Sequence, residues 1–290
     1  MSTTFRRSAA SLRLAVLVFA LVVVAPPGRA QTAPGPAEQA TILRAADRVY
    51  VRELTRLRKT NALAIDERTL DRMRHAADPL IKRAQEVRPE SRQWQWAINV
   101  ELRAEPVLYC LPGGRMLISS GFLDALRPTP GELSALLAHV IAHALEGHDG
   151  DEAAAQFAQR REAGDADPNR GELKLGDLML KLMLSEPQLP EAERSADALA
   201  LELLARAAED PRSALSAWRK VAAFARPTPP AFPALHPATQ LRIDAMQLAM
   251  PAMVLLYETT LREQAPAPPP KVKERKGKVP PGDKVRPPPA

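Results

Sequence analysis

The feature that most restricts the fold is a helix start followed by two histidines four residues apart, His139 and His143. The start is Thr129-Pro130-Gly131-Glu132, which combines a hydroxyl cap, a proline in the first turn and a glutamate three residues after the cap. The helix should run until Gly147. Residues four apart lie on one face of a helix, so both imidazoles can bind one metal ion. The sequence therefore predicts a helix that contributes two ligands to a metal site.

Val140 follows the first histidine, where a zinc-peptidase helix with this spacing has the glutamate that activates the attacking water. Valine can neither accept a proton from that water nor pass one to the leaving amine. The glutamate is not a metal ligand, so its replacement should leave metal binding intact. Because general acid-base catalysis contributes about 10²–10⁴-fold, we expect a site that binds metal and cleaves poorly.

Two imidazoles need at least one further protein ligand to form a zinc site. A second predicted helix starts at Pro190 and has Glu193 and Asp197 four residues apart on one face. A gluzincin-type site takes its third ligand from a glutamate on such a second helix. Glu193 is therefore the candidate third ligand.

Helical spacing of apolar residues occupies most of the chain between 37 and 262. Three short apolar or alternating runs, separated by Pro- and Gly-containing segments, suggest a small antiparallel sheet at 94–102, 107–111 and 115–119. The fold class we expect is α+β and mostly helical. Besides the helix with the histidine pair, the predicted helices cover 37–58, 66–88, 151–163, 171–184, 190–208, 211–224 and 238–262.

The two ends of the chain differ in composition from the rest. Residues 1–30 combine arginines, an apolar run from Leu14 to Val24 and a small-x-small pattern at Gly28-Arg29-Ala30, which is typical of a secretory signal peptide. The run is shorter than the roughly 20 residues that span a bilayer, so we expect no membrane span after cleavage. Residues 31–36 form a linker, 37–263 the folded domain, and 264–290 a disordered Pro- and Lys-rich tail.

Charge and cysteine content narrow the function classes. The net charge of +6 comes from the two ends, and the predicted domain between them is slightly acidic, which argues against nucleic-acid binding. The basic tail either contacts anionic polymers of the cell envelope or serves as a solubilising extension. Cys110 is the only cysteine, so no intrachain disulfide is possible. Together with the signal peptide, this predicts a soluble exported protein, periplasmic in location.

Several motifs, in their order along the chain, resemble those of the HtpX / CAAX-prenyl-protease family of zinc metallopeptidases, and most closely its soluble periplasmic BepA-like branch. The resemblance runs from about Trp94 to Leu248. The motifs that carry it are Tyr109-Cys110-Leu111-Pro112-Gly113-Gly114-Arg115, Ser120-Gly121-Phe122-Leu123, Leu137-Ala138-His139-Val140-Ile141-Ala142-His143 followed by His148, Glu193-x-x-Ala196-Asp197 followed by Asp210-Pro211, and Leu235-His236-Pro237 with Arg242-Ile243.

The resemblance implies a gluzincin-like metallopeptidase domain that binds zinc through His139, His143 and Glu193 and acts on unfolded or envelope proteins. It makes Asp197 a partner that orients a ligand histidine. By analogy His236 approaches the metal or the developing oxyanion; the alternative is a turn residue before a proline. His139 and His143 could instead be buried structural histidines, and Glu193 a surface residue in a salt bridge.

Three hypotheses for the function remain. In the first, the protein is a peptidase homologue with little or no hydrolysis that holds extended peptides along the sheet edge near Val107, Tyr109 and Leu111. In the second, it is an active metalloendopeptidase in which Glu146, seven residues after His139, replaces the missing base. In the third, it is a metal-free helical scaffold whose basic tail binds envelope anions.

Overall fold

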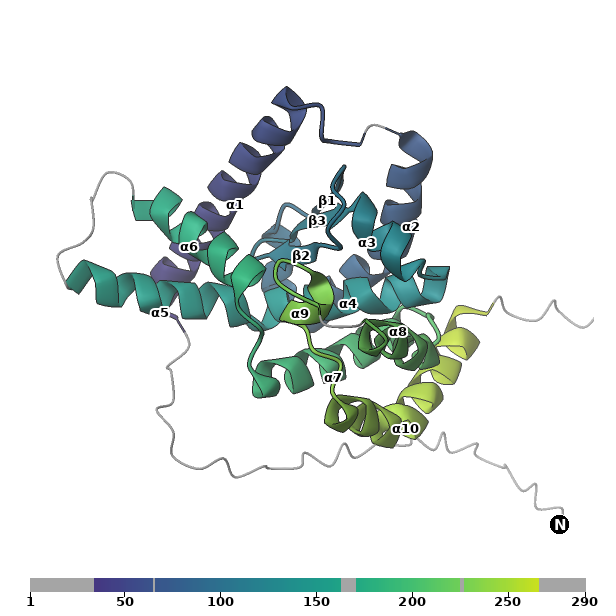
Figure 1. The fold of residues 1–290 in the computed structure, drawn as a ribbon. Helices are drawn as coiled ribbons and strands as arrows, with labels where there is room; N and C mark the ends of the chain where they lie inside the picture. Colours follow the sequence, from purple (N-terminus) through teal and green to yellow (C-terminus); the bar gives the residue numbers. More distant parts are fainter. Residues whose placement is uncertain (1–33, 65, 163–170, 225–226, 266–290) are drawn as a thin grey trace, which may run out of the picture. The chain divides into compact units, whose positions relative to one another are not determined.

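Helix α4 (Pro130–Glu146) is the central element, and every residue from Glu132 to Leu145 in it is buried. A helix that is apolar on all sides must be covered on all sides. In the computed structural model, α2, α7, α8 and strand β2 pack against it, and Figure 1 shows α4 between the sheet and α7. The structure describes residues 34–64, 66–162, 171–224 and 227–265, and Gly35 begins the compact unit to which the following refers.

The strands and helices predicted from the sequence occur in the expected order, with ends that agree to within about three residues, whereas the short helices η1, α3 and α9 were not predicted. The strands are β1 (Ala97–Glu101), β2 (Leu108–Leu111) and β3 (Arg115–Ser119). The helices, besides α4, are α1 (Pro36–Lys59), α2 (Glu67–Val87), the 3₁₀ helix η1 (Pro89–Gln93), α3 (Ser120–Leu126), α5 (His148–Glu162), α6 (Gly171–Ser185), α7 (Pro190–Arg206), α8 (Arg212–Ala222), α9 (Phe232–Leu235) and α10 (Gln240–Gln264).

The predicted start and end of α4 are confirmed. The Thr129 amide donates to a Glu132 carboxylate oxygen at 2.8 Å, and the Glu132 amide donates to the Thr129 hydroxyl at 3.3 Å, which completes a capping box. Gly147 ends the helix in the left-handed conformation, with φ of 76°. These local signals fix where the histidine pair lies along the helix.

The mostly helical α+β fold is confirmed, but the sheet is mixed and not wholly antiparallel. Its order is β1-β3-β2, with β2 antiparallel and β1 parallel to β3. The β2–β3 hairpin turns through Gly113 and Gly114, both at positive φ, as the Pro-Gly-Gly pattern indicates. The segment after β1 instead carries the chain past β3, so strands that are neighbours in sequence are not neighbours in the sheet.

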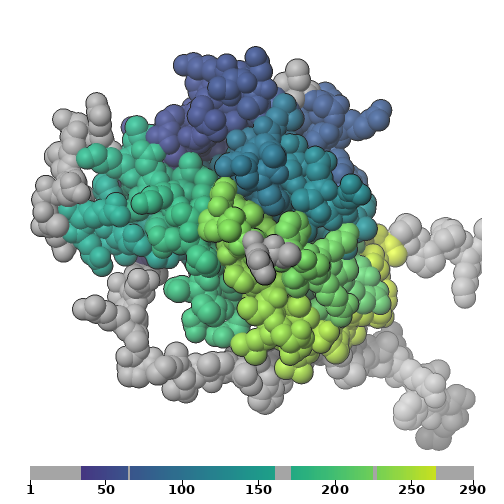
Figure 2. Space-filling view, viewed as in Figure 1, coloured from purple at the N-terminus to yellow at the C-terminus, as the bar shows by residue number. Residues whose placement is uncertain are grey.

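Strand β2 is buried on both faces, between two apolar clusters. Leu108 and Cys110 face the cluster around α4, whereas Tyr109 and Leu111 face a second cluster built on α1, α5 and α6. The sheet therefore lies inside the fold. Figure 2 shows α6 to α10, green to yellow, packed against one another on the face in view.

The predicted signal peptide lies outside the described residues, as does the tail beyond Ala265, and helix α1 begins at Pro36. Among the described residues, no helix is both long and apolar enough to cross a bilayer.

Candidate metal centre

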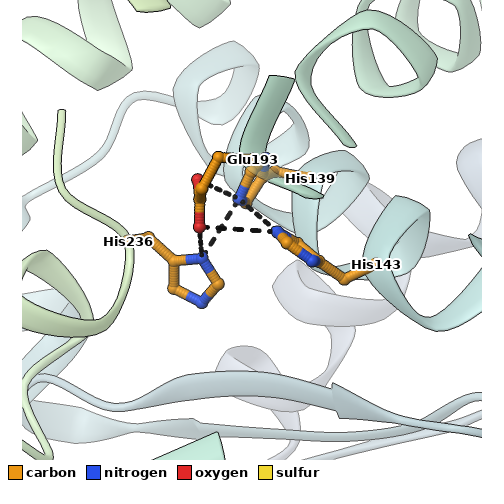
Figure 3. Close-up of side chains that lie close together, drawn as sticks. All are labelled: His139, His143, Glu193 and His236. Atoms are coloured by element: carbon orange, nitrogen blue, oxygen red, sulfur yellow. Dashed lines mark hydrogen bonds and ion pairs between the residues drawn. The ribbon is translucent and has the colours of Figure 1, made fainter. Parts of the chain in front are cut away.

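Four side chains from distant parts of the sequence point toward one another (Figure 3). His139 and His143 come from α4, Glu193 from the first turn of α7, and His236 from the residue directly after α9. One ligand atom from each lies within 4.8 Å of all the others. Their exposed fractions are 0, 2, 2 and 7% in that order. The structure thus brings together the three predicted ligands and His236, which the family resemblance placed near the metal or the oxyanion and which lies 97 residues after His139.

Backbone hydrogen bonds from two other segments hold His236 in this position. The Phe232 amide at the start of α9 donates to the Pro106 carbonyl before β2 at 2.7 Å. The Gln188 amide before α7 donates to the Leu235 carbonyl at 2.9 Å. The His236 ring also lies against Phe232, with ring centroids 4.6 Å apart. The short helix is therefore tied at both ends, and its last residue turns into the centre.

The separations between the donor atoms fit a small tetrahedral cation. His139 Nε2 is 3.1 Å from His143 Nε2 and 3.3 Å from His236 Nδ1. Glu193 oxygens lie 3.4 Å from His139 Nε2, 3.6 Å from His143 Nε2 and 2.7 Å from His236 Nδ1. Zinc bonds of about 2.0–2.1 Å place tetrahedral ligand atoms about 3.3 Å apart. Three imidazole nitrogens and a carboxylate this close together, and away from water, match the ligands of such an ion.

Asp197 occupies the position expected of an orienting partner. Its Oδ1 lies 3.0 Å from His139 Nδ1, which is the ring nitrogen that faces away from the donor cluster. This contact favours a proton on Nδ1 and leaves the Nε2 lone pair directed at the other donors.

Arg242, in the first turn of α10, connects the acidic residues of the centre. Its guanidinium donates to both oxygens of Asp197, at 2.8 and 2.7 Å, and forms an ion pair with Glu193 Oε2. It also donates to the Pro237 carbonyl at 2.9 Å and lies 4.0 Å from the centroid of the Trp218 ring. Sequence reasoning quoted Arg242 but gave it no role. One signal in the sequence could have indicated its role. Arg242 lies near a helix N-terminus, where the helix dipole disfavours a cation, so a nearby acidic partner is to be expected.

The charge states follow from burial and from the neighbouring groups. Burial, together with the nearby His139 and His236, holds the pKa of His143 well below its usual value. Burial lowers the pKa of His236, although Glu193 opposes the shift. Burial alone would raise the pKa of Glu193, but His236 and His139 outweigh it and hold that pKa well below its usual value. Two neutral imidazoles and a carboxylate are the forms that bind a metal.

His139 behaves differently from the other imidazoles. Burial lowers its pKa, but the charge of Glu193 and the contact with Asp197 outweigh burial, so its pKa is raised. A second proton on His139 would occupy Nε2, the nitrogen that faces the other donors, and so competes with a cation for that atom.

Val140 is 2% exposed and belongs to the apolar cluster around α4. Because this residue is a valine, position 140 supplies no carboxylate to the centre. Glu146 does not replace it. A Glu146 oxygen lies 3.3 Å from His148 Nε2, and His148 Nδ1 lies 3.0 Å from His143 Nδ1, the ring atom opposite the donor cluster. The His148 ring therefore lies between the Glu146 carboxylate and the donor residue His143, and the structure does not bring Glu146 to the position that a replacement base would need.

The three residues expected beside a peptide at the sheet edge have buried side chains. Val107, Tyr109 and Leu111 are 2, 5 and 0% exposed and pack in the cluster with α1, α5 and α6. Their side chains stabilise the core and do not face a groove. Only the main chain of β2 is left to meet a peptide.

A buried carboxyl that sequence reasoning missed lies beside the centre. Asp149, in the first turn of α5, accepts a hydrogen bond of 2.6 Å from the Gln188 side chain, and burial raises its pKa to about 7. In the sequence it resembles any acidic residue of a first helical turn, and no local pattern distinguishes it.

Comparisons with known proteins match the part of the sequence that contains the site. The family model described as "Peptidase family M48" matches residues 77–249, a range that contains all four donors. The "Mitochondrial metalloendopeptidase OMA1" of Saccharomyces cerevisiae is 26% identical over 172 residues, and that of Schizosaccharomyces pombe 27% over the same length. Each match covers 57% of this chain and 50% of the relative, so the chain spans about half the length of these relatives.

Replacing Arg242 tests whether it balances the buried acidic residues. We expect Arg242→Met to lower the free energy of unfolding by about 3–5 kcal/mol in urea denaturation of chelator-treated protein, because two buried carboxylates lose their cationic partner. Arg206→Met, which breaks the surface pair with Glu202, is the control and should change little. Equal stability of the two variants would contradict this role for Arg242.

The raised pKa of Asp149 predicts a pH-dependent effect. In the unfolded chain Asp149 ionises near pH 4, whereas in the folded chain its pKa is about 7. The folded state therefore loses stability as the pH rises from 4 through 7, by about 4 kcal/mol at most. Asp149→Asn removes this loss, so its melting temperature without metal should exceed that of the wild type at pH 8 by more than at pH 5. A pH-independent difference would contradict the assignment.

Proposed function

Because the chain belongs to peptidase family M48, we propose that it is a zinc-binding member of the family that holds extended or unfolded polypeptides and has little or no hydrolytic activity. The observation that carries this proposal is the cluster of His139, His143, Glu193 and His236, with a buried valine after the first histidine.

The donor set favours zinc over other common cations. Three imidazoles and one carboxylate suit zinc, whereas calcium and magnesium prefer sites made of oxygen atoms. The spacing of the donors agrees with this choice, as does their burial.

The residues divide the work of the site as follows. His139, His143 and Glu193 would hold the ion, and Asp197 would keep the His139 lone pair directed at it. When bound, zinc supplies a Lewis acid that polarises a peptide carbonyl and acidifies a water molecule. The chain has no group at position 140 to accept that proton.

His236 is a second reason to expect weak hydrolysis. Catalytic zinc sites keep one position free of protein ligands, whereas structural sites have four. His236 Nδ1 lies 3.3 Å from His139 Nε2 and 2.7 Å from Glu193 Oε1, distances similar to those among the other donors. Its approach supports a centre in which the protein supplies a fourth ligand where a catalytic site binds water.

For the polypeptide, we propose binding along β2. This strand pairs with β3 along one edge, and in the part of the chain that the structure describes no strand pairs with its other edge. An extended peptide added there would be held by main-chain hydrogen bonds and would need no cleavage.

We place the protein in the periplasm, on the basis of the signal-peptide pattern in residues 1–30, and closest to the BepA-like branch, on the basis of the Leu235-His236-Pro237 motif. The competing hypothesis of a metal-free scaffold leaves the convergence of three imidazole nitrogens unexplained. It also predicts the opposite result for metal content.

Metal content tests the first part of the proposal. The purified full chain, loaded with zinc and dialysed, should retain about one zinc ion per chain, because the four donors form one site. His139→Ala should lose most of it, and His75→Ala, which removes an exposed histidine of α2, should not. Wild-type protein without stoichiometric metal would favour the scaffold hypothesis.

Cleavage of an unfolded protein substrate tests the second part. The zinc-loaded wild type should show no cleavage that a chelator abolishes. Val140→Glu, made in a His236→Ala background that frees a position for water, should exceed His236→Ala alone by about 10²-fold or more because it restores a general base. Val140→Gln is the matched control, since it adds similar polarity and size without a base. Chelator-sensitive cleavage by the wild type at a rate close to that of Val140→Glu would disprove weak hydrolysis.

A further inference from the structure

His148 contacts the metal centre without belonging to the donor cluster. It is the first residue of α5, and its Nδ1 lies 3.0 Å from His143 Nδ1. The two ring planes meet at 73°, with centroids 5.0 Å apart. Nothing in the proposed function uses this contact.

The positions of the nitrogens fix the protons along this contact. His143 Nε2 faces the donor cluster, so a metal there requires the lone pair on Nε2 and the proton on Nδ1. Among the described residues its hydrogen-bond partner is His148 Nδ1, which must then be the acceptor. A neutral His148 keeps its single proton on Nε2, on the side of Glu146.

Glu146 completes the chain of contacts. One of its oxygens lies 3.3 Å from His148 Nε2, and this buried oxygen has no hydrogen-bond partner among the described residues. A carboxylate beside Nε2 favours a proton on that nitrogen. Glu146 therefore favours the His148 tautomer with its proton on Nε2. That tautomer in turn favours the His143 tautomer with its proton on Nδ1.

The other helical ligand has the same kind of support. His139 Nδ1 faces Asp197, which Arg242 holds in place by two hydrogen bonds. The Asp197 carboxylate contacts His139 directly, whereas the His148 imidazole lies between the Glu146 carboxylate and His143.

The backbone turn between α4 and α5 places His148. Gly147 separates the two helices and adopts φ of 76°, which turns the chain so that the next side chain folds back over His143. At this position a Cβ atom would meet the Asp151 carboxylate at 3.0 Å. The contact thus depends on a turn that favours glycine.

We propose that His148 is a positioning residue that, with Glu146, holds His143 in the tautomer and orientation that present Nε2 to the metal. This inference rests on the proposed metal site. Partners of this kind change metal affinity by about 10–100-fold in other proteins.

Cobalt in place of zinc gives a test that does not depend on hydrolysis, because its absorption bands report ligand geometry. The full chain is titrated with Co²⁺ as wild type, His148→Ala and His148→Asn. We expect His148→Ala to raise the Kd by about tenfold and to change the Co²⁺ spectrum. His148→Asn should restore both, since the Asn Oδ1 occupies the place of Nδ1 and accepts the same proton. His75→Ala is the control for the loss of a histidine and should match the wild type.

The outcomes separate this inference from the proposed function. Failure of the wild type to bind Co²⁺ would overturn the metal site and this inference with it. Normal Co²⁺ affinity and spectrum in His148→Ala would overturn the inference alone. So would equal defects in the Ala and Asn variants with equally lowered melting temperatures of the metal-free protein, which is the signature of a purely structural residue.

Discussion

The contact of Arg242 with Glu193 and Asp197 is the interaction on which the centre depends. It brings one cation to two carboxylates that are 2 and 6% exposed, in a part of the fold where unpaired charge is costly. Because Arg242 comes from α10 and the carboxylates from α7, the same contact joins these two helices beneath the histidines of α4. The hydrogen bond to the Pro237 carbonyl extends the connection to the residue next to His236. Packing and charge balance therefore come from the same side chain.

Much of the fold could be predicted because its signals are local. The cap at Thr129, the glycine at 147 and the prolines that begin α1, α4 and α7 act on the residues next to them, and the structure has these ends where the sequence places them. Strand pairing is different. Which edge β1 joins depends on the path of the chain after Glu101, and no feature of β1 itself encodes it. The helix α9, with four residues, is too short for a periodic signal.

The site divides in the same way. The pair His139 and His143 follows from helical spacing, and Glu193 from a second helix of the right composition. That His236 would reach them depends on the hydrogen bonds that α9 makes with the Pro106 carbonyl and the Gln188 amide, which are remote in sequence. Glu146 illustrates the opposite error. Its spacing from His139 suggested one face of the helix, but the turn at Gly147 places His148 between Glu146 and the donors.

Because His139 and His236 are far apart in the sequence, a metal bound at the centre would stabilise the fold whether or not it takes part in hydrolysis. A cation bound by both would join segments 97 residues apart and would bind the folded state alone. By linkage, each tenfold excess of free metal over its dissociation constant then adds about 1.4 kcal/mol to folding stability. A cation that stabilises the fold in this way needs ligands and no base. The chain has that combination of residues, with His139, His143 and Glu193 as donors and a valine at position 140.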